Sequence, residues 1–400
     1  RDAQESRGLG DVYKRQMTAS FTEKTGVPVK VVTAASGDYS NTLNAQMGKD
    51  GAPTIYNIGN MSGLKDWDEY ALDLTGTALA GELATNDFNL YNEAGELKAM
   101  GYCYESFGII VNTKLLADAG HSLDEIKDFA SLKAVADDIH ARAAELGFDA
   151  FSSAGLDGSS SWRFSGHLAN MPLYYEFRDD GVTEQPAEIK GTYLDNFRNI
   201  WDLYITDSAA DPTALSTATG DQSEAEFGEG KAVFYQNGTW EYAALTADKF
   251  NLNPDEIAMI PIYCGVDGEE KAGLCSGTEN CWAINSQAKE EDIQASLDFL
   301  YWLVTDPDAS AVLVEQLGAV PFKNCPASAN KFIVDGNALL ADGKYAVTWA
   351  FNYTPNVDSW RATVVTALAA YSADPTDANW EAVKTAFVDG WAIEYKTVNG

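Results

Sequence analysis

The sequence has little positive charge: 27 Lys and Arg stand against 60 Asp and Glu in 400 residues, for a formal net charge of −33. A surface this acidic repels nucleic-acid phosphates and anionic lipid, so we expect neither as a partner. Long apolar runs are missing as well, and the sequence holds no stretch of about 18 apolar residues that would span a membrane. With 46% hydrophobic residues, the chain is nevertheless too apolar for an acidic disordered protein.

Cysteine and histidine are also sparse. Five cysteines, an odd number without CxxC spacing, indicate neither a zinc site nor a disulfide framework. Cys264 and Cys275 flank a predicted hairpin turn at 266–271 and could face each other, but free buried thiols are favoured. The three histidines are too dispersed for a metal cluster, so we expect no metal and no cofactor: His121, His140 and His167.

The length predicts two or three domains, because 400 residues exceed what one hydrophobic core supports. Residues 1–16 lack apolar periodicity and the features of a secretory signal, so we expect a non-native or disordered leader. A helix over 17–26 and a strand over 27–35 follow. An α/β domain that begins on a helix lacks its opening strand, and we expect the native strand and any export signal to lie upstream.

Helical and extended patterns alternate along the rest of the chain. The predicted strands are 54–58, 97–103, 107–111 and 257–263. The predicted helices are 39–49, 113–120, 131–147, 192–205, 290–306, 354–372 and 377–391. This βα pattern is typical of a mostly parallel sheet covered on both faces. In helix 192–205, one stripe of large apolar residues predicts a core face: Tyr193, Phe197, Ile200, Trp201 and Tyr204.

The stretch 227–240, FGEGKAVFYQNGTW, places a large aromatic residue just after a buried strand. Asn237-Gly238 predicts a turn, and Trp240 then opens a helical segment. A cleft protein would present a flat apolar surface to its ligand at such a place. The alternative is that Trp240 fills a gap in the core.

Eight segments, in this order, carry a family resemblance: FTEKTGVPVKV, GAPTIYNIGN, YESFGIIVNTKLL, FGEGKAVFYQNGTW, IAMIPIY, GTENCWAINSQA, LGAVPFK and FNYTPNVDSWRA. Together they cover residues 17–400. The sequence thereby resembles the extracellular solute-binding proteins of ABC importers, in particular the carbohydrate-binding group that includes maltose-binding protein.

The resemblance implies an α/β fold of the periplasmic-binding-protein type II, with two lobes and a ligand cleft between them. Lobe 1 would be 17–110 plus 260–307, and lobe 2 would be 111–259 plus 308–400. The absent opening strand departs from the family and puts the stability of lobe 1 in doubt. The implied function is to bind a sugar or oligosaccharide and deliver it to the membrane permease subunits of an ABC importer. The protein would be an extracellular monomer at the outer face of the cell membrane, lipid-anchored in its full-length form.

Sugar recognition requires aromatic rings for the C–H faces of pyranoses and fixed polar groups for the hydroxyls. By resemblance, Trp240 in QNGTW and Trp360 in VDSWRA match stacking aromatics of lobe 2, and Trp162 in the loop SSSWRF is a third candidate.

The polar candidates come from lobe 1. Glu105 in YESFG matches the family's acidic residue at the first crossing. Asn57 and Asn60 follow the strand PTIY, at the carboxyl end where α/β clefts bind ligands. Glu279 and Asn280 in GTEN would line the same wall. The alternative for each is a surface or turn residue.

Two other functions remain open. A glycoside hydrolase would need two carboxylates in one cleft, such as Glu105 and Glu176. However, the sequence lacks the Ser-His-Asp order, HExxH, phosphate loop and dinucleotide fingerprint, so we expect no enzyme. A ferric-ion binder of the same fold would use the tandem Tyr174-Tyr175, yet MPLYYEF continues a helix with one core-facing and one exposed tyrosine.

Overall fold

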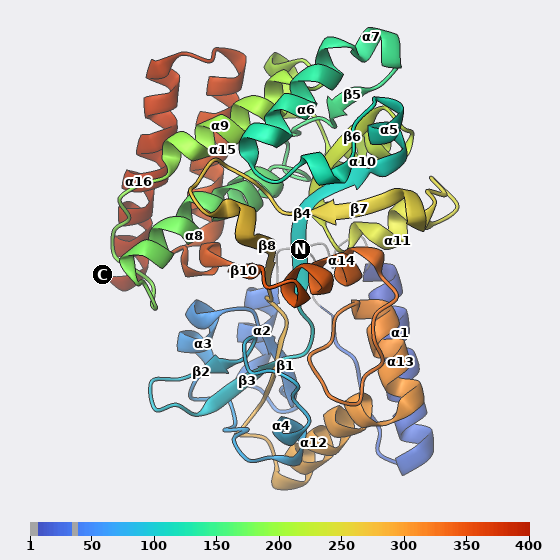
Figure 1. The fold of residues 1–400 in the computed structure, drawn as a ribbon. Helices are drawn as coiled ribbons and strands as arrows, with labels where there is room; N and C mark the ends of the chain where they lie inside the picture. Colours follow the sequence, from blue (N-terminus) through green and yellow to red (C-terminus); the bar gives the residue numbers. More distant parts are fainter. Residues whose placement is uncertain (1–6, 34–38) are drawn as a thin grey trace. The chain divides into compact units, whose positions relative to one another are not determined.

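The chain passes three times between two units in the computed structural model, which describes residues 7–33 and 39–400 (Figure 1). Unit 1 comprises the described residues up to Glu105 together with Gly277–Ala329, and unit 2 comprises Ser106–Ser276 and Asn330–Gly400. The sequence predicts crossings near 110, 260 and 307 instead. The second and third lie later in the structure because β7 pairs with a strand of unit 2 and because α13 packs on α12 of unit 1.

Unit 1 contains a four-stranded sheet in the order β1-β9-β3-β2. Its strands are β1 (Ile55–Ile58), β9 (Cys281–Ile284), β3 (Leu97–Gly101) and β2 (Leu90–Tyr91), and every neighbouring pair is antiparallel. Because β9 lies between β1 and β3, Asn57 of β1 pairs with Trp282. The sheet therefore brings the segment GTEN next to β1, although the two lie far apart in the sequence.

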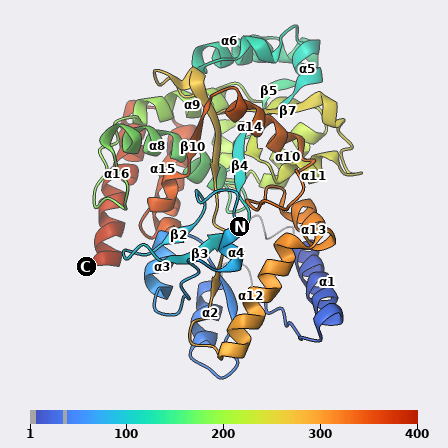
Figure 2. The ribbon, with the colours of Figure 1, turned by 60° about the horizontal axis from the view of Figure 1, so that its bottom comes forward.

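The helices of unit 1 are α1 (Arg7–Thr25), α2 (Tyr39–Met47), α3 (Met61–Trp67), α4 (Ala78–Gly81), α12 (Glu290–Thr305) and α13 (Pro307–Leu317). In Figure 2, α1 runs beside α13. Met17 and Phe21 of α1 are buried in the same apolar cluster as Phe299 of α12. Asp306 and Pro307 begin α13 as a side-chain cap and a first-turn proline, which is the usual arrangement at a helix N-terminus.

Residues 7–16 are helical and continue α1 toward its N-terminus, so they are not disordered, whereas the non-native origin of the leader stays a prediction. Residues 1–6 lie outside the described part of the chain. Once Met17 and Phe21 anchor the helix, each further residue adds a hydrogen bond at low cost, and no proline interrupts the helix.

The strand prediction for 27–35 is not met in its described part, because 27–33 has no strand pairing. The expected alternation is nevertheless present: Val27, Val29 and Val31 are half-buried, whereas the residues between them are exposed. Residues 34 and 35 lie outside the described part. The segment has the side-chain pattern of a strand without a neighbouring strand to bond.

Unit 2 contains a larger, mixed sheet in the order β10-β8-β4-β6-β5, with β7 also pairing with β4. The strands are β4 (Glu105–Asn112), β5 (Asp149–Phe151), β6 (Ala232–Gly238), β7 (Ile257–Ile260), β8 (Ala272–Gly277) and β10 (Tyr345–Thr348). The pairs β10–β8 and β5–β6 are parallel, whereas β4 runs antiparallel to β6 and β7. The prediction of a mostly parallel sheet is therefore wrong. Parallel pairing of successive strands requires a crossover connection, and β4 enters unit 2 directly from unit 1.

The predicted hairpin at 266–271 is also wrong, because β7 pairs with β4 and not with β8. All five cysteines are free thiols. Four of them are buried, and Cys325 is half-buried. Burial raises the pKa of Cys281 to about 12, which keeps this group a neutral thiol.

The helices of unit 2 are α5 (Thr113–Asp118), α6 (Phe129–Ala141), α7 (Ala143–Leu146), α8 (Ala169–Asp180), α9 (Leu194–Thr206), α10 (Gly220–Gly228), α11 (Glu241–Thr246), α14 (Lys331–Ala341), α15 (Val357–Ala373) and α16 (Asp377–Asn399). The predicted core stripe of α9 is confirmed for Phe197, Ile200, Trp201 and Tyr204, which are buried, whereas Tyr193 precedes α9 and is half-buried. Figure 1 shows α15 and α16 packed side by side. Across residues 7–33 and 39–400, no helix is long and apolar enough to cross a membrane.

Candidate functional site

The end of β6 positions Trp240 in unit 2. Asn237 and Gly238 are the last residues of β6 and pair with Gly108 and Phe107 of β4, so the turn prediction at Asn237-Gly238 is wrong. The ladder to β4 continues through both residues. Trp240 follows two residues later, directly before α11, and remains half-buried.

Trp162 lies beside Trp240. It precedes a π-helical turn, Arg163–Leu168, where the sequence predicts a loop. Such turns are rare and recur at functional sites. The two indole centroids are 6.1 Å apart with a 49° interplanar angle, and both side chains are half-buried. The structure thus brings two of the three predicted tryptophans together into one aromatic face, defined here by Trp162 and Trp240.

His167, which sequence reasoning missed as a site residue, supports this aromatic face. Its ring lies 5.0 Å from Trp162 and 5.6 Å from Trp240 by centroids, and it stacks on Phe107 at 3.9 Å. Burial, followed by the charges of Arg163 and Arg361, holds the pKa of His167 well below its usual range. The imidazole is therefore neutral. Residues 162 and 167 are five apart and would lie on different faces of an α-helix, so helical periodicity does not predict their contact.

Arg163 ties the π-helical turn to the sheet. Its Nε donates to the Gln236 carbonyl oxygen at 2.8 Å, and its Nη1 donates to Ser160 Oγ at 3.1 Å. The guanidinium also lies over the rings of Phe164 and Tyr235. These contacts join the segment that carries Trp162 to the strand that leads to Trp240.

Trp360 belongs to the core of unit 2. Its side chain is completely buried in α15, and its Nε1 donates to the Phe387 carbonyl oxygen at 2.9 Å. The ring contacts Phe387 and Trp391 edge-on across the α15–α16 pair. No ring face is left for a ligand, so the expectation that Trp360 stacks on a sugar is not carried forward.

Three of the predicted polar residues lie together in unit 1. Asn57 Nδ2 donates to the Glu279 carbonyl oxygen at 3.1 Å, and Asn57 Oδ1 accepts from the Cys281 amide at 2.9 Å. The Asn57 side chain therefore bridges the backbone on both sides of Asn280. Tyr102 contacts the same segment, because its amide donates to the Asn280 carbonyl oxygen at 3.0 Å. Asn57 holds the segment GTEN in place, while the half-buried side chains of Glu279 and Asn280 lie beside it.

Asn60 and Glu105 occupy end positions of elements in unit 1. Asn60 is the N-cap of α3, and its Oδ1 accepts from the Gly63 amide at 2.9 Å. This is a structural role for the acceptor oxygen. Glu105 is the first residue of β4 and is half-buried. The preceding Tyr104 is fixed by a backbone bond to Ala319 and by stacking on Phe88 at 4.6 Å.

One of the two carboxylates that a glycoside hydrolase would use, that of Glu176, already binds backbone amides. Glu176 is buried in α8, where its two carboxylate oxygens accept from the backbone amides of Lys190 and Thr192, each at 2.7 Å. A carboxylate that holds two amides in this way anchors a loop and has no oxygen positioned for proton transfer.

The tyrosines considered for iron lie in α8, as the helical interpretation predicts. Tyr175 is fully buried, and burial raises its pKa, which opposes formation of a phenolate. Tyr174 is half-buried and lies nearly parallel to Tyr345. Within the described residues, no group of three or more Asp, Glu, His or Cys is arranged to hold a metal ion.

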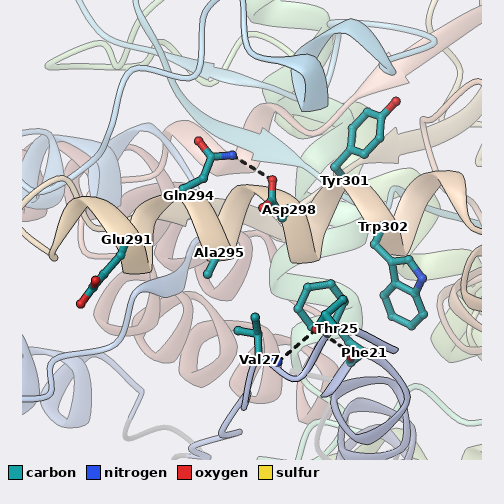
Figure 3. Close-up of a pocket in the computed structure, with 9 residues that line it drawn as sticks. All are labelled: Phe21, Thr25, Val27, Glu291, Gln294, Ala295, Asp298, Tyr301 and Trp302. Atoms are coloured by element: carbon teal, nitrogen blue, oxygen red, sulfur yellow. Dashed lines mark hydrogen bonds between the residues drawn. The ribbon is translucent and has the colours of Figure 1, made fainter. Parts of the chain in front are cut away.

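A hollow of about 570 Å³ lies along α12 and the end of α1 in unit 1 (Figure 3). Phe21, Val27, Ala295 and Trp302 form its apolar part. Gln294 and Asp298 also line it, and the Gln294 side chain donates to Asp298 at 2.8 Å, as Figure 3 shows. Small-molecule sites combine an apolar wall with polar groups that converge on the ligand, and such convergence does not occur among these lining residues. We therefore do not assign a site to this hollow.

Comparisons with known proteins agree with this fold. Residues 16–333 match the family described as bacterial extracellular solute-binding protein. No curated protein matches the chain.

Solved structures match over almost the whole length. The raffinose complex of the solute-binding protein RafE has a TM-score of 0.74 at 16% identity, with 96% of each chain covered. A sugar transporter from Bacillus licheniformis in complex with stachyose gives 0.69 at 15% identity, also with 96% of each chain covered. The GacH receptor of Streptomyces glaucescens, studied with acarbose, gives 0.66 at 18% identity, with 96% of this chain and 95% of that chain covered. At these identities the likeness establishes the fold, and the prediction of an α/β fold of the periplasmic-binding-protein type is confirmed.

Proposed function

Because the chain belongs to the bacterial extracellular solute-binding protein family, we propose that it binds a sugar or oligosaccharide and delivers it to an ABC importer. The observation that carries the sugar proposal is the aromatic face of Trp162 and Trp240, two half-buried indoles beside a neutral histidine. Pyranose rings expose C–H groups that pack on aromatic faces. An uncharged support for that face suits an uncharged ligand.

The structural relatives support the same ligand class. Three proteins that share this fold have been solved in complex with raffinose, stachyose and acarbose. Each of the three compounds is an oligosaccharide or a close analogue. We propose that this chain takes a ligand of that class, of a size that its two tryptophans can contact together.

Polar recognition of the hydroxyl groups is assigned in this proposal to Glu105, Glu279 and Asn280 of unit 1. Asn57 and Asn60 support the backbone of the site and do not contact the sugar in this proposal, since their side-chain oxygens already accept bonds from backbone amides. Following the family resemblance, the ligand would contact both units. The proposal further includes a monomer outside the cell, lipid-anchored in its full-length form, with the permease subunits of an importer as partners.

A thermal-shift screen tests the sugar proposal directly. Raffinose, stachyose, acarbose and a chitin oligosaccharide are added separately, and a ligand at 100 times its Kd should stabilise the folded state by about 2.7 kcal/mol. Glucose serves as the short control. If no oligosaccharide raises the melting temperature, the proposed ligand class is wrong.

Two further assays test the alternative functions on the same sample. The protein should not release the chromophore from aryl glycosides, because Glu176 is committed to backbone amides. Ferric ion should produce no phenolate-to-iron absorption band, because the buried Tyr175 resists ionisation. Turnover of a glycoside or appearance of that band would replace the proposed function with the corresponding alternative.

A further inference from the structure

The side-chain amide of Asn237 uses all of its hydrogen-bonding capacity at the base of Trp240. Its Oδ1 accepts from Trp240 Nε1 at 3.1 Å and from the Gly238 amide at 3.0 Å. Its Nδ2 donates to the Tyr235 hydroxyl at 2.7 Å and to Glu241 Oε1 at 2.9 Å. An asparagine amide offers two donors and two acceptor positions, so these four bonds fix its orientation. The group is also almost completely buried.

Gly238 supplies the surface on which the indole lies. A Cβ atom at this position would lie 2.2 to 2.5 Å from Cη2, Cζ3 and Cζ2 of Trp240, closer than such atoms approach. Glycine is therefore required here for space. Asn237 fixes the Nε1 edge of the ring, and Gly238 allows the six-membered ring to lie against the strand.

Trp162 is held in a similar way from the neighbouring turn. Its Nε1 donates to the Ser159 carbonyl oxygen at 2.8 Å. Both indoles of the aromatic face thus use their only polar atom to bond the protein. A fixed ring loses little conformational freedom when a ligand packs on it, which preserves affinity.

We propose that Asn237 is a positioning residue that holds Trp240 against Gly238, so that the aromatic face is formed before any ligand arrives. Asn237 itself does not touch the sugar, and its effect on affinity passes through Trp240. The proposal rests on the proposed function for its consequence in binding, whereas the geometry of the indole pair tests it independently of any ligand.

The first test is the near-ultraviolet circular dichroism of the ligand-free protein. Two indoles 6.1 Å apart and held at 49° are expected to couple and contribute a paired signal, which Trp240→Phe and Trp162→Phe should each abolish. Asn237→Ala should reduce that signal by more than half, because the ring loses its Nε1 partner. The matched control is Asn170→Ala, a buried amide of unit 2 that bonds the Thr348 carbonyl oxygen and the Phe351 amide instead. It should leave the paired signal unchanged.

The second variant, Gly238→Ala, keeps Asn237 and removes the space under the ring. It should displace Trp240 and reduce the paired signal in the same way, and it covers the case in which Asn237→Ala does not fold. An unchanged signal in whichever of the two variants folds would overturn the proposal.

The third test is a double-variant cycle on sugar affinity. Asn237→Ala should raise Kd about tenfold, and the double variant Asn237→Ala/Trp240→Ala should bind no more weakly than Trp240→Ala alone. Additive losses would overturn a role that passes through Trp240. If the parent binds no oligosaccharide, the proposed function fails, while the dichroism of the ligand-free variants still decides the role of Asn237.

Discussion

Trp240 and Trp162 keep part of their indoles accessible, whereas Trp201 and Trp360 are completely enclosed. This difference predicts opposite results from the same substitution. Trp240→Ala and Trp162→Ala should each weaken oligosaccharide binding by about 1 to 3 kcal/mol, the usual loss for an aromatic anchor in a binding site. Calorimetric titration measures the affinity, and denaturant unfolding should show little change in stability. Parent-like affinity in both variants would refute the stacking assignment.

Trp360→Ala and Trp201→Ala should instead destabilise the fold by roughly 3 to 5 kcal/mol, because each leaves a cavity in a packed core. Each substitution also removes a donor from a buried acceptor: the Phe387 carbonyl oxygen loses the indole N–H of Trp360, and Ser372 Oγ loses the indole N–H of Trp201. Denaturant unfolding of the two variants measures this loss. A stable Trp360→Ala protein with reduced sugar affinity would restore Trp360 to the site.

Asp207 makes a pH-dependent contribution to stability. Burial, and then the neighbouring Asp137, raise its pKa to about 6 in the folded protein, against about 3.9 for an unfolded chain. The folded state thus binds the proton more tightly, and this contribution is lost as pH rises from about 4 through 6. We therefore compare the free energy of unfolding of Asp207→Asn with that of the parent. The difference should favour the variant by roughly 1 kcal/mol more at pH 7.5 than at pH 4.5, after allowance for solvent screening.

Denaturant unfolding of the Asp207→Asn variant and the parent at both pH values measures this gain. The other groups that face Asp207, Asp137 and His140, are present in both proteins. An equal difference between variant and parent at the two pH values would contradict the assignment.

Residue patterns in the sequence do not separate a site tryptophan from a core tryptophan. Trp240 directly precedes α11 and Trp360 lies in the first turn of α15, so position near the start of a helix does not distinguish them. Their burial differs because α16 covers Trp360. This contact between two helices is not encoded in the local sequence pattern. His167 was missed for a related reason, since its contact with Trp162 depends on a π-helical turn.

At the scale of elements, β1 shows how a strand edge is closed by a side chain. The Tyr39 hydroxyl accepts from the Asn57 amide at 2.7 Å and donates to the Asn57 carbonyl oxygen at 3.1 Å. Tyr39→Phe should remove both bonds and destabilise unit 1 by about 0.5 to 1.5 kcal/mol. Amide hydrogen exchange at Asn57 should accelerate.

The matched control for this substitution is Tyr91→Phe. Tyr91 is a similarly exposed tyrosine of unit 1 whose hydroxyl has only a 3.4 Å contact with Asn89 Nδ2. It should leave both stability and exchange at Asn57 unchanged. Equal effects of the two substitutions would show that the Tyr39 hydroxyl does not close the edge.

Helices were predicted better than strand pairing. The apolar stripe of α9 follows from sequence spacing alone, because a helix forms its hydrogen bonds within one segment. Strand pairing depends on distant partners. The segment 27–33 carries strand-like alternation without a partner, and Asn237-Gly238 continues a strand because β4 lies opposite.

At the scale of the whole molecule, the order of eight short motifs indicated the family and the α/β fold, which the match over residues 16–333 bears out. Each motif is weak alone, but their order reflects one topology that passes repeatedly between two units. The exact crossing points depend on where β7 and α13 pack, and sequence pattern does not define those contacts.

The final prediction concerns how ligand acts on the two units together. Three chain segments connect them, at 105/106, 276/277 and 329/330. A sugar that contacts Trp240 of unit 2 and Glu279 of unit 1 would bind most tightly where both contacts form at once. It would therefore shift the population toward that arrangement in proportion to its differential affinity.

Small-angle scattering should show a smaller radius of gyration at saturating oligosaccharide. Trp240→Ala, titrated to the same saturation, should compact less, because one side of the differential contact is gone. An unchanged radius for the saturated parent would show that the ligand is held by one unit alone, and the assignment of Glu105, Glu279 and Asn280 to the sugar hydroxyls would fall with it.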